Sequence, residues 1–287
     1  MNRSLGVGLL LFVTLVWGST FVVTKESLES VPPGLFLALR FSAAALALAW
    51  VRPVPGMFRT GLVLGLVMFL SYGSQTVGLY YTSASKGAFI TALSVVLVPM
   101  FTGISGRRWL PLRVWLAALL ALGGLGLMTL TDVSGVNIGD LIIVGTAVTY
   151  ALHLLLIDRG LRKFPPLQLA AAQLWPVAVL SWLWAAPDVG LIGQLPAGVW
   201  WSVLYLALVA TALVLVLQNV AQKYVPPHTA ALIFVLEPVF AAVFSWLVLG
   251  EQLGLYGWLG GILVVGGMVL GEIRPAGTPA VRADEAA

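Results

Sequence analysis

The sequence contains no cysteine, and its only histidines are His153 and His228. A disulfide and a cysteine-ligated metal are therefore excluded, and the redox compartment cannot be read from cysteine usage. Two histidines are too few for a histidine-rich metal site. We expect neither a metal nor a cofactor.

Charge is also scarce, because only 9% of the 287 residues are charged while 60% are hydrophobic. Soluble domains carry about a quarter charged residues, so a soluble protein with a large core is excluded. A phosphate-binding loop ending in Gly-Lys-Ser/Thr is missing as well. Nucleotide-driven chemistry within this chain is therefore not expected.

Long apolar segments make up most of the chain. A membrane-spanning helix needs about 20 mainly apolar residues, and ten segments of that kind are bounded by charge, proline or glycine. The first is expected to be a retained helix, because an A-x-A cleavage signal is missing near its end. The sequence predicts an all-α polytopic membrane protein with spans at residues 5–23, 33–52, 58–80, 85–104, 111–130, 138–157, 166–186, 199–220, 227–248 and 253–272.

Basic residues predict the orientation, since cytoplasmic loops are enriched in lysine and arginine. With the N-terminus inside, only Lys25 and Lys86 of the 15 basic residues lie in outer segments, and Arg40 lies within the second span. Both termini are therefore expected in the cytoplasm, and no nucleic-acid partner is needed to explain the positive charge. The twelve basic residues expected on the cytoplasmic side are Arg3, Arg52, Arg59, Arg107, Arg108, Arg113, Arg159, Arg162, Lys163, Lys223, Arg274 and Arg282.

The two halves of the chain resemble one another. The double prolines at 32–33 and 165–166 align at an offset of 133 residues, which also pairs Trp17 with Tyr150 and Arg40 with Gln173. Later in each half, Pro99 in VLVPMF matches Pro238 in VLEPVF. Each half holds five spans, an odd number, so the second half is expected to be inverted. We expect repeats at residues 1–132 and 133–273, followed by a disordered cytoplasmic tail at 274–287.

Inverted five-helix repeats are typical of secondary transporters, which place the substrate site near the midplane between the repeats. The ordered motifs WGST (17–20), LRF (39–41), EP (237–238) and LGE (249–251) resemble those of the drug/metabolite transporter superfamily, EamA family. That resemblance covers nearly the whole chain. It implies ten helices and export of amino acids or other metabolites across a bacterial-type inner membrane, with aromatic amino-acid exporters of the YddG type as the nearest suggestion.

Glu237 is an acidic residue about midway along a predicted span. A charge at the membrane centre costs about 2.5–3.5 kcal/mol or more, so this side chain is expected to face the bundle interior. It could bind a proton or a substrate amine, or it could only accept hydrogen bonds that Pro238 leaves free. Pro99 and Pro238 are interpreted as bends that either gate transport or only shape the bundle.

Other polar and aromatic residues are predicted to bind substrate. Trp17 and Tyr150 occupy equivalent positions and could face each other across a cavity or only pack. Arg40 could anchor a substrate carboxylate, but a structural tie is favoured. The predicted substrate-binding residues are Trp17, Ser19, Thr20, Tyr72, Gln75, Tyr150, Gln173 and Glu237.

The scarcity of buried charge favours a small neutral or zwitterionic substrate moved by alternating access. The chain is not expected to be an enzyme, because no catalytic acid–base–nucleophile group is recognisable. A membrane-embedded enzyme acting on lipid and a non-transporting structural membrane protein are the alternatives. Besides the substrate and the lipid bilayer we expect no partner beyond a weak homodimer, with a monomer as the other possibility.

Overall fold

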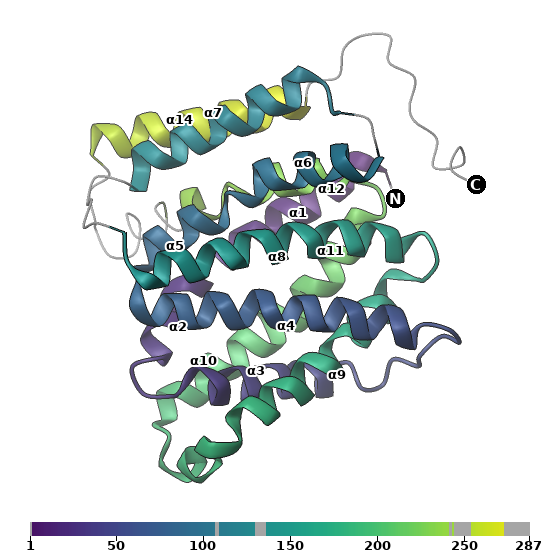
Figure 1. Cartoon of the computed structure of the whole chain (residues 1–287), viewed down its shortest axis with the longest axis vertical. Helices are drawn as coiled ribbons and strands as arrows, with labels where there is room; N and C mark the ends of the chain where they lie inside the picture. The colour runs from purple at the N-terminus through teal and green to yellow at the C-terminus, as the bar shows by residue number, and fades with distance from the viewer. Residues whose placement is uncertain (1, 107–108, 130–135, 241–242, 244–253, 273–287) are drawn as a thin grey trace.

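The computed structural model describes residues 2–106, 109–129, 136–240, 243 and 254–272, and the regular elements in these residues are all helical (Figure 1). Six helices are long and apolar enough to cross a membrane, and four shorter apolar helices occupy the other predicted spans. The second span ends at Ala47 rather than residue 52, and the sixth continues to Leu161. The predicted repeat boundary at 132/133, the tail at 274–287 and the LGE motif lie outside the described residues.

Several of the ten spans consist of more than one helical element. The elements are α1 (Arg3–Gly18), α2 (Thr20–Ser27), α3 (Pro33–Ala47), α4 (Phe58–Tyr81), α5 (Ala84–Thr91), α6 (Ser94–Gly106), α7 (Leu112–Thr129), α8 (Ile138–Leu161), α9 (Pro166–Ala185), the 3-10 helix η1 (Ala186–Gln194), α10 (Ala197–Ala207), the π-helical turn η2 (Leu208–Leu213), α11 (Val214–Gln222), α12 (Pro227–Phe234) and α14 (Leu255–Glu272).

Local polar side chains accompany the break in the first span. Between α1 and α2, the hydroxyl of Ser19 donates to the carbonyl of Val16 at 2.9 Å, and the hydroxyl of Thr20 donates to the carbonyl of Trp17 at 2.9 Å. Serine and threonine hydroxyls compete in this way with backbone donors of a helix. The WGST motif therefore forms an interrupted helix rather than a continuous one.

The two aligned prolines behave differently. In the ninth span α12 stops at Phe234, and helical backbone resumes at Glu237, so that Pro238 lies in the first turn of the new segment. A proline loses nothing there, because the first turn of a helix does not use its N–H groups internally. Pro99 lies inside α6 instead, and the fourth span is interrupted earlier, between Thr91 and Ser94. Gating by either proline remains a prediction.

Helix packing joins the two halves. α1 packs on α11 and α12, and α8 packs on α4, α5 and α6. α3 packs on α9 and α10, and α4 also packs on α9. The described part of the core contains a large apolar cluster built from α1, α3, α9 and α10.

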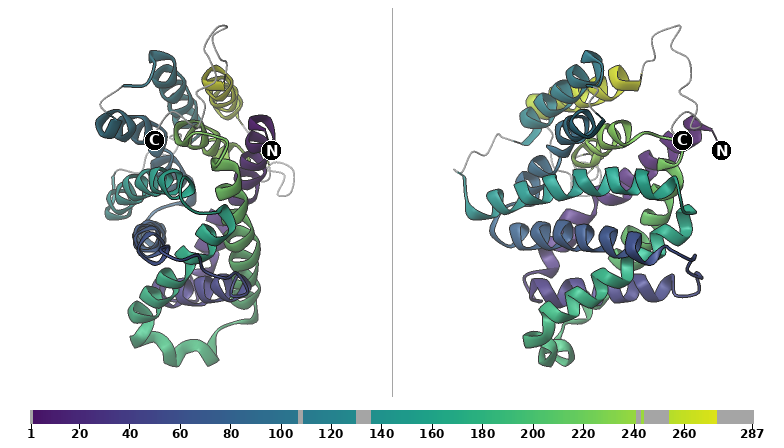
Figure 2. Two further views of the ribbon diagram at one scale, coloured as in Figure 1. Left: turned by 90° about the vertical axis from the view of Figure 1, so that its right-hand side faces the viewer. Right: turned by 45° about the vertical axis from the view of Figure 1, so that its right-hand side comes forward.

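The pair formed by α7 and α14 lies along one edge of the molecule, opposite η1 (Figures 1 and 2). Glycines allow these two helices to approach closely. A Cβ added to Gly124 would lie 2.5 Å from the carbonyl oxygen of Gly260, and one added to Gly267 would lie 2.7 Å from that of Ala117. Small residues at helix contacts have this effect in membranes.

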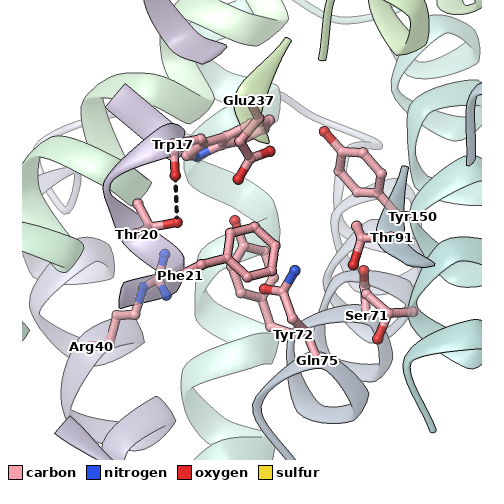
Figure 3. A pocket seen from close by; sticks show the side chains of 11 residues that line it. Trp17, Thr20, Phe21, Arg40, Ser71, Tyr72, Gln75, Thr91, Tyr150 and Glu237 are labelled. Carbon is pink, nitrogen blue, oxygen red and sulfur yellow. Dashed lines mark hydrogen bonds between the residues drawn. The ribbon is translucent and has the colours of Figure 1, made fainter. Parts of the chain in front are cut away.

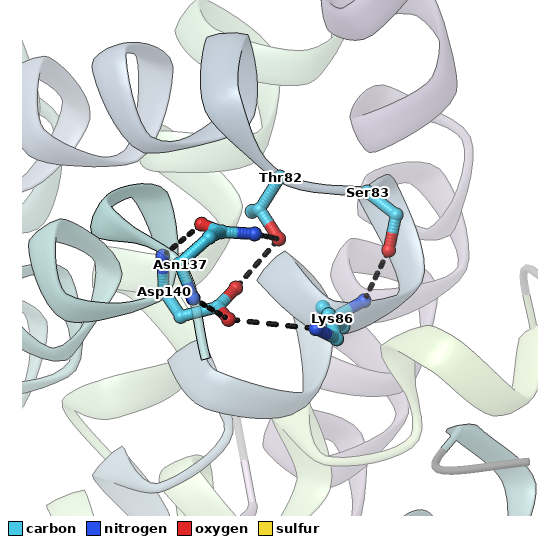
Figure 4. A network of polar contacts seen from close by, with 5 residues as sticks. All are labelled: Thr82, Ser83, Lys86, Asn137 and Asp140. Atoms are coloured by element: carbon cyan, nitrogen blue, oxygen red, sulfur yellow. Dashed lines mark hydrogen bonds and ion pairs between the residues drawn. The ribbon is translucent and has the colours of Figure 1, made fainter. Parts of the chain in front are cut away.

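One end of the bundle, where α4 stops and α8 begins, is held by a polar cluster that we call the Asp140 cluster (Figure 4). Asp140 and Asn137 form a capping box at the N-terminus of α8, with both hydrogen bonds at 3.0 Å. The hydroxyl of Thr82 donates to Asp140 at 2.6 Å, and the Lys86 ammonium lies 3.5 Å from the same carboxylate. Lys25 adds two hydrogen bonds, to the carbonyls of Leu79 and Thr82.

The Asp140 cluster therefore links the ends of α2, α4, α5 and α8. The backbones also approach closely at this point, since a Cβ added to Gly139 would lie 2.6 Å from the carbonyl oxygen of Gly78. Residues at the ends of the first, third, fourth and sixth spans therefore contact one another at this end of the bundle.

Candidate functional site

A pocket lies between the helices of the two halves (Figure 3). It contains about 440 Å³ of empty space, counting the part that opens to solvent. Helices α1 to α5 contribute most of its lining, and α8 and the segment after α12 contribute the rest. The lining residues are Trp17, Thr20, Phe21, Arg40, Ser71, Tyr72, Gln75, Thr91, Thr146, Tyr150 and Glu237.

Aromatic rings form one wall of the pocket. The rings of Trp17 and Tyr150 meet edge to face with 6.2 Å between centroids, and Phe234 packs 5.0 Å from Trp17. Aromatic groups combine large apolar area with polar tips. The wall therefore offers both a flat apolar surface and the Tyr150 hydroxyl.

The π-helical turn η2 positions two of the lining residues. The indole N–H of Trp17 donates to the carbonyl of Ala210 at 3.0 Å, and the Nε of Arg40 donates to the Thr211 hydroxyl at 2.9 Å. π-Helical turns occur frequently at functional sites. In this chain the turn supplies a backbone acceptor and a side-chain acceptor at neighbouring residues, both directed at the pocket lining.

Arg40 is only 3% exposed, and its guanidinium lies over the ring of Tyr72 at 5.0 Å from the centroid. No ion pair within 4.0 Å joins Arg40 to an acidic residue in the described part of the chain. Its hydrogen bond to Thr211 uses Nε alone. The two terminal nitrogens of the guanidinium therefore stay free of protein partners among the described residues.

Glu237 extends its carboxylate into the pocket from the side away from Arg40 (Figure 3). Among the described residues no hydrogen bond or ion pair involves this carboxylate. Two further lining groups, the Tyr150 hydroxyl and the Thr91 hydroxyl, are buried without a partner. Buried polar groups normally have partners, so these atoms mark the pocket as a place for a ligand or water.

Six of the eight residues predicted to bind substrate line this pocket: Trp17, Thr20, Tyr72, Gln75, Tyr150 and Glu237. The other two, Ser19 and Gln173, do not. The Ser19 hydroxyl instead shares a hydrogen bond of 2.6 Å with the hydroxyl of Tyr205. Gln173 is fully buried and lies 2.6 Å from Nε2 of His153. The assignment of these two residues to the substrate site stays a prediction, and in this structure their polar groups take part in contacts between helices.

Sequence reasoning missed five lining residues. Arg40 had been assigned a structural role, and Phe21, Ser71, Thr91 and Thr146 were not selected. The two threonines are isolated polar residues within apolar segments, which was the available signal. Phe21 gave no signal, because an aromatic residue in an apolar helix is indistinguishable from core.

The chemistry available at the pocket is that of binding. No group of three or more histidine, aspartate or glutamate side chains that could hold a metal is found among the described residues. One cation, one carboxylate, hydroxyls and aromatic faces are present instead. These groups suit recognition of a small solute that has both polar and apolar parts.

Comparison with known proteins assigns the family. A model of the EamA-like transporter family matches residues 4–130 and again residues 137–271. An uncharacterised transporter of Archaeoglobus fulgidus is 34% identical over 266 residues, which cover 92% of this chain and 85% of the relative. The uncharacterised transporter YoaV of Bacillus subtilis is 23% identical over 280 residues, covering 90% and 93% of the two chains.

A solved crystal structure has a similar fold, with a TM-score of 0.74 and 18% sequence identity, covering 94% of this chain and 98% of the other. At that identity the likeness concerns the fold alone. The family match covers nearly all of the sequence, and the apolar helices agree with it. The chain is a multi-pass membrane protein and belongs to the EamA-like transporter family.

Proposed function

We propose that the chain is a secondary transporter that exports amino acids, or similar small neutral or zwitterionic metabolites, by alternating access through the pocket of Figure 3. The observation that carries this proposal is the set of lining groups without protein partners, namely the Glu237 carboxylate and the hydroxyls of Thr91 and Tyr150. Polar groups at membrane depth are costly when unsatisfied and mark substrate pathways. A transported solute would supply the missing partners.

Helix packing supports alternating access. The first span contacts the eighth and ninth, and the sixth contacts the third and fourth. The same pattern results when each span of one half is exchanged for its counterpart in the other, as inverted repeats at residues 1–132 and 133–273 would require. Two such halves can rock around a fixed site and expose it to either side in turn.

The lining also supports a particular substrate size and polarity. The aromatic wall formed by Trp17 and Tyr150 offers an apolar surface for a side chain, which is compatible with aromatic amino acids. The described lining includes one basic and one acidic residue, so these charges balance, which suits a zwitterion. A solute with several negative charges would need more cations than Arg40 alone.

Direction and location form part of the same proposal. The excess of basic residues in alternate loops supports cytoplasmic termini, and the inner membrane and the outward direction follow from the family resemblance. The proposed function is transport rather than catalysis. We assign gating to the interrupted spans, among them the fourth and the ninth, which contain Pro99 and Pro238.

Transport by proteoliposomes tests the proposal. Liposomes loaded with each unlabelled neutral amino acid should accumulate the labelled form by counterflow. Thr146→Trp should abolish the exchange, because Thr146 lines the pocket and is 1% exposed. Leu141→Trp is the matched control in the same helix, since Leu141 is 61% exposed. A folded protein that exchanges no amino acid or neutral metabolite above protein-free liposomes would refute the proposal.

A further inference from the structure

The geometry points to Arg40 as the anion-binding residue of the pocket, so that the transported substrate carries a carboxylate. This inference rests on the proposed function and extends it by assigning one substrate group to one side chain. It reverses the expectation from sequence alone, in which Arg40 was a structural tie. Three observations support it: the burial of Arg40, the groups that contact it and the groups that do not.

Burial comes first. Arg40 is 3% exposed and lines the pocket from the second span. A guanidinium is always charged, and a charge inside the membrane requires a partner or water. If Arg40 only held helices together, an acidic residue or several carbonyls would be expected around its guanidinium. Among the described residues, the guanidinium instead contacts one hydroxyl, that of Thr211, and the rings of Tyr72 and Phe41.

The contacts also explain how the guanidinium is held. Thr211 accepts from Nε, and the guanidinium carbon lies over the Tyr72 ring at 5.0 Å from its centroid. Both interactions fix the orientation of the group, yet they leave the two terminal nitrogens unused. Thr211 is itself held in the turn η2. It acts as a positioning residue that presents the outer edge of the guanidinium to the pocket.

A free guanidinium edge selects a planar anion. Arginine binds carboxylates through two parallel N–H···O hydrogen bonds, which add directional specificity to charge. Arg40 is the only basic residue among the described lining residues, so the pocket offers one such site in this part of the chain. A free amine on the same substrate would then face Glu237, on the other side of the pocket in Figure 3. An α-amino acid carries both of these groups.

Three related ligands test this inference separately from the proposed function. A neutral amino acid, its amide and its N-acetyl derivative differ only in the carboxylate or the amine. Each is titrated against purified wild-type protein, and binding is measured from the ligand-induced rise in Tm, because a ligand that binds the native state stabilises it. We expect the amide to bind roughly ten- to a hundredfold more weakly than the acid, as the loss of charge-assisted hydrogen bonds implies.

Variants assign the effect to Arg40. Arg40→Gln should bind the acid and the amide equally. Arg40→Lys should keep part of the preference for the acid, because lysine retains the positive charge but lacks the paired N–H donors of arginine. Thr211→Val should weaken acid binding while leaving amide binding unchanged, and Thr211→Ser should restore it. Arg52→Gln is the control, since Arg52 is exposed in a loop and its replacement should change the affinity for neither the acid nor the amide.

The outcomes are distinct. Equal binding of acid and amide by the wild type would overturn the role of Arg40 while leaving the transporter proposal intact. An acid preference that persists in a folded Arg40→Gln protein would overturn it as well. If no form of any amino acid binds or is exchanged, both proposals fail. If Arg40→Gln does not fold, the Thr211 pair decides, because equal acid binding by Thr211→Val and Thr211→Ser would contradict the positioning of Arg40.

Discussion

The indole N–H of Trp17 donates a hydrogen bond to the carbonyl oxygen of Ala210, 3.0 Å away and 193 residues later in the chain. This bond joins the WGST motif of the first span to the π-helical turn of the eighth. One residue further on, Thr211 holds Arg40. The same turn thereby contacts both a ring of the aromatic wall and the one basic residue among the described lining residues.

Replacing Trp17 by phenylalanine tests how much this hydrogen bond contributes to stability and binding. The variant keeps an aromatic ring but leaves the Ala210 carbonyl without its donor, which costs about 1–3 kcal/mol for a buried group. We expect a lower Tm and weaker amino-acid binding. Trp201→Phe is the control, because Trp201 is 73% exposed. Equal unfolding temperatures for the two variants would show that the bond contributes nothing to the turn.

The pair of His153 and Gln173 gives a second prediction, about stability alone. Gln173→Leu leaves the buried imidazole of His153 without the group that lies 2.6 Å from it, so the free energy of unfolding should fall by about 1–3 kcal/mol. The double variant His153→Phe/Gln173→Leu should recover part of the loss. Amino-acid affinity should stay unchanged in both. A selective loss of affinity at normal stability would instead support the predicted place of Gln173 in the substrate site.

Two adjacent glycines in α7 provide a matched test of helix packing. Gly124→Ala would place a methyl group 2.5 Å from the carbonyl oxygen of Gly260, whereas the same change at Gly123 meets nothing within 4 Å. Thermal unfolding should show Gly124→Ala destabilised by about 1–3 kcal/mol through overpacking. Gly123→Ala should be neutral or stabilising by about 0.5–1 kcal/mol, because alanine favours helix. Indistinguishable variants would contradict the close contact of α7 with α14.

Periodicity and composition sufficed to predict the spans, because a bilayer imposes length and apolarity on each helix. The breaks inside the spans were harder to predict. Pro238 indicated one of them, yet Pro99 lies inside a helix while the fourth span breaks six to seven residues earlier, at residues 92–93. The π-helical turn in LVATAL had no sequence signal. Its acceptors bind Trp17 and Arg40, which are remote in sequence.

The lining of the pocket was likewise predictable only in part. Residues such as Tyr72 and Glu237 were predicted because polar groups in apolar helices must face the interior, and they do line the pocket. The sequence does not reveal which interior contact a polar side chain makes. Gln173 has a buried partner nearby in His153, whereas Arg40 has no acidic partner. Tertiary structure decides between these two situations.

The Asp140 cluster should control access to the pocket from its end of the bundle. Asp140→Asn removes the carboxylate that accepts from Thr82 and pairs with Lys86, so this end should open more often. The native chain has no cysteine, so Thr146→Cys provides a single reporter in the pocket. A membrane-impermeant maleimide added outside intact cells should label that cysteine faster in the Asp140→Asn background.

Asp158→Asn is the control for this labelling experiment. It removes an ion pair to Arg162 at the opposite end of the same helix, α8. Labelling from outside should then stay at the level of the Thr146→Cys protein alone. Faster labelling in the Asp158→Asn background, or none in the Asp140→Asn background, would assign the closure of the pocket to contacts other than the Asp140 cluster.

Glu237→Gln tests the side of the pocket away from Arg40. The carboxylate has no protein partner among the described residues, so a substrate ammonium would be its natural counter-ion inside the membrane. The variant keeps the size of the side chain but removes its charge. We expect an amino acid to bind roughly tenfold more weakly or worse, whereas its N-acetyl derivative should bind as it does to the wild type. Glu29→Gln, in an exposed position, should change neither affinity. Equal losses for both ligands would mean that Glu237 supports the break before Pro238 rather than the substrate amine.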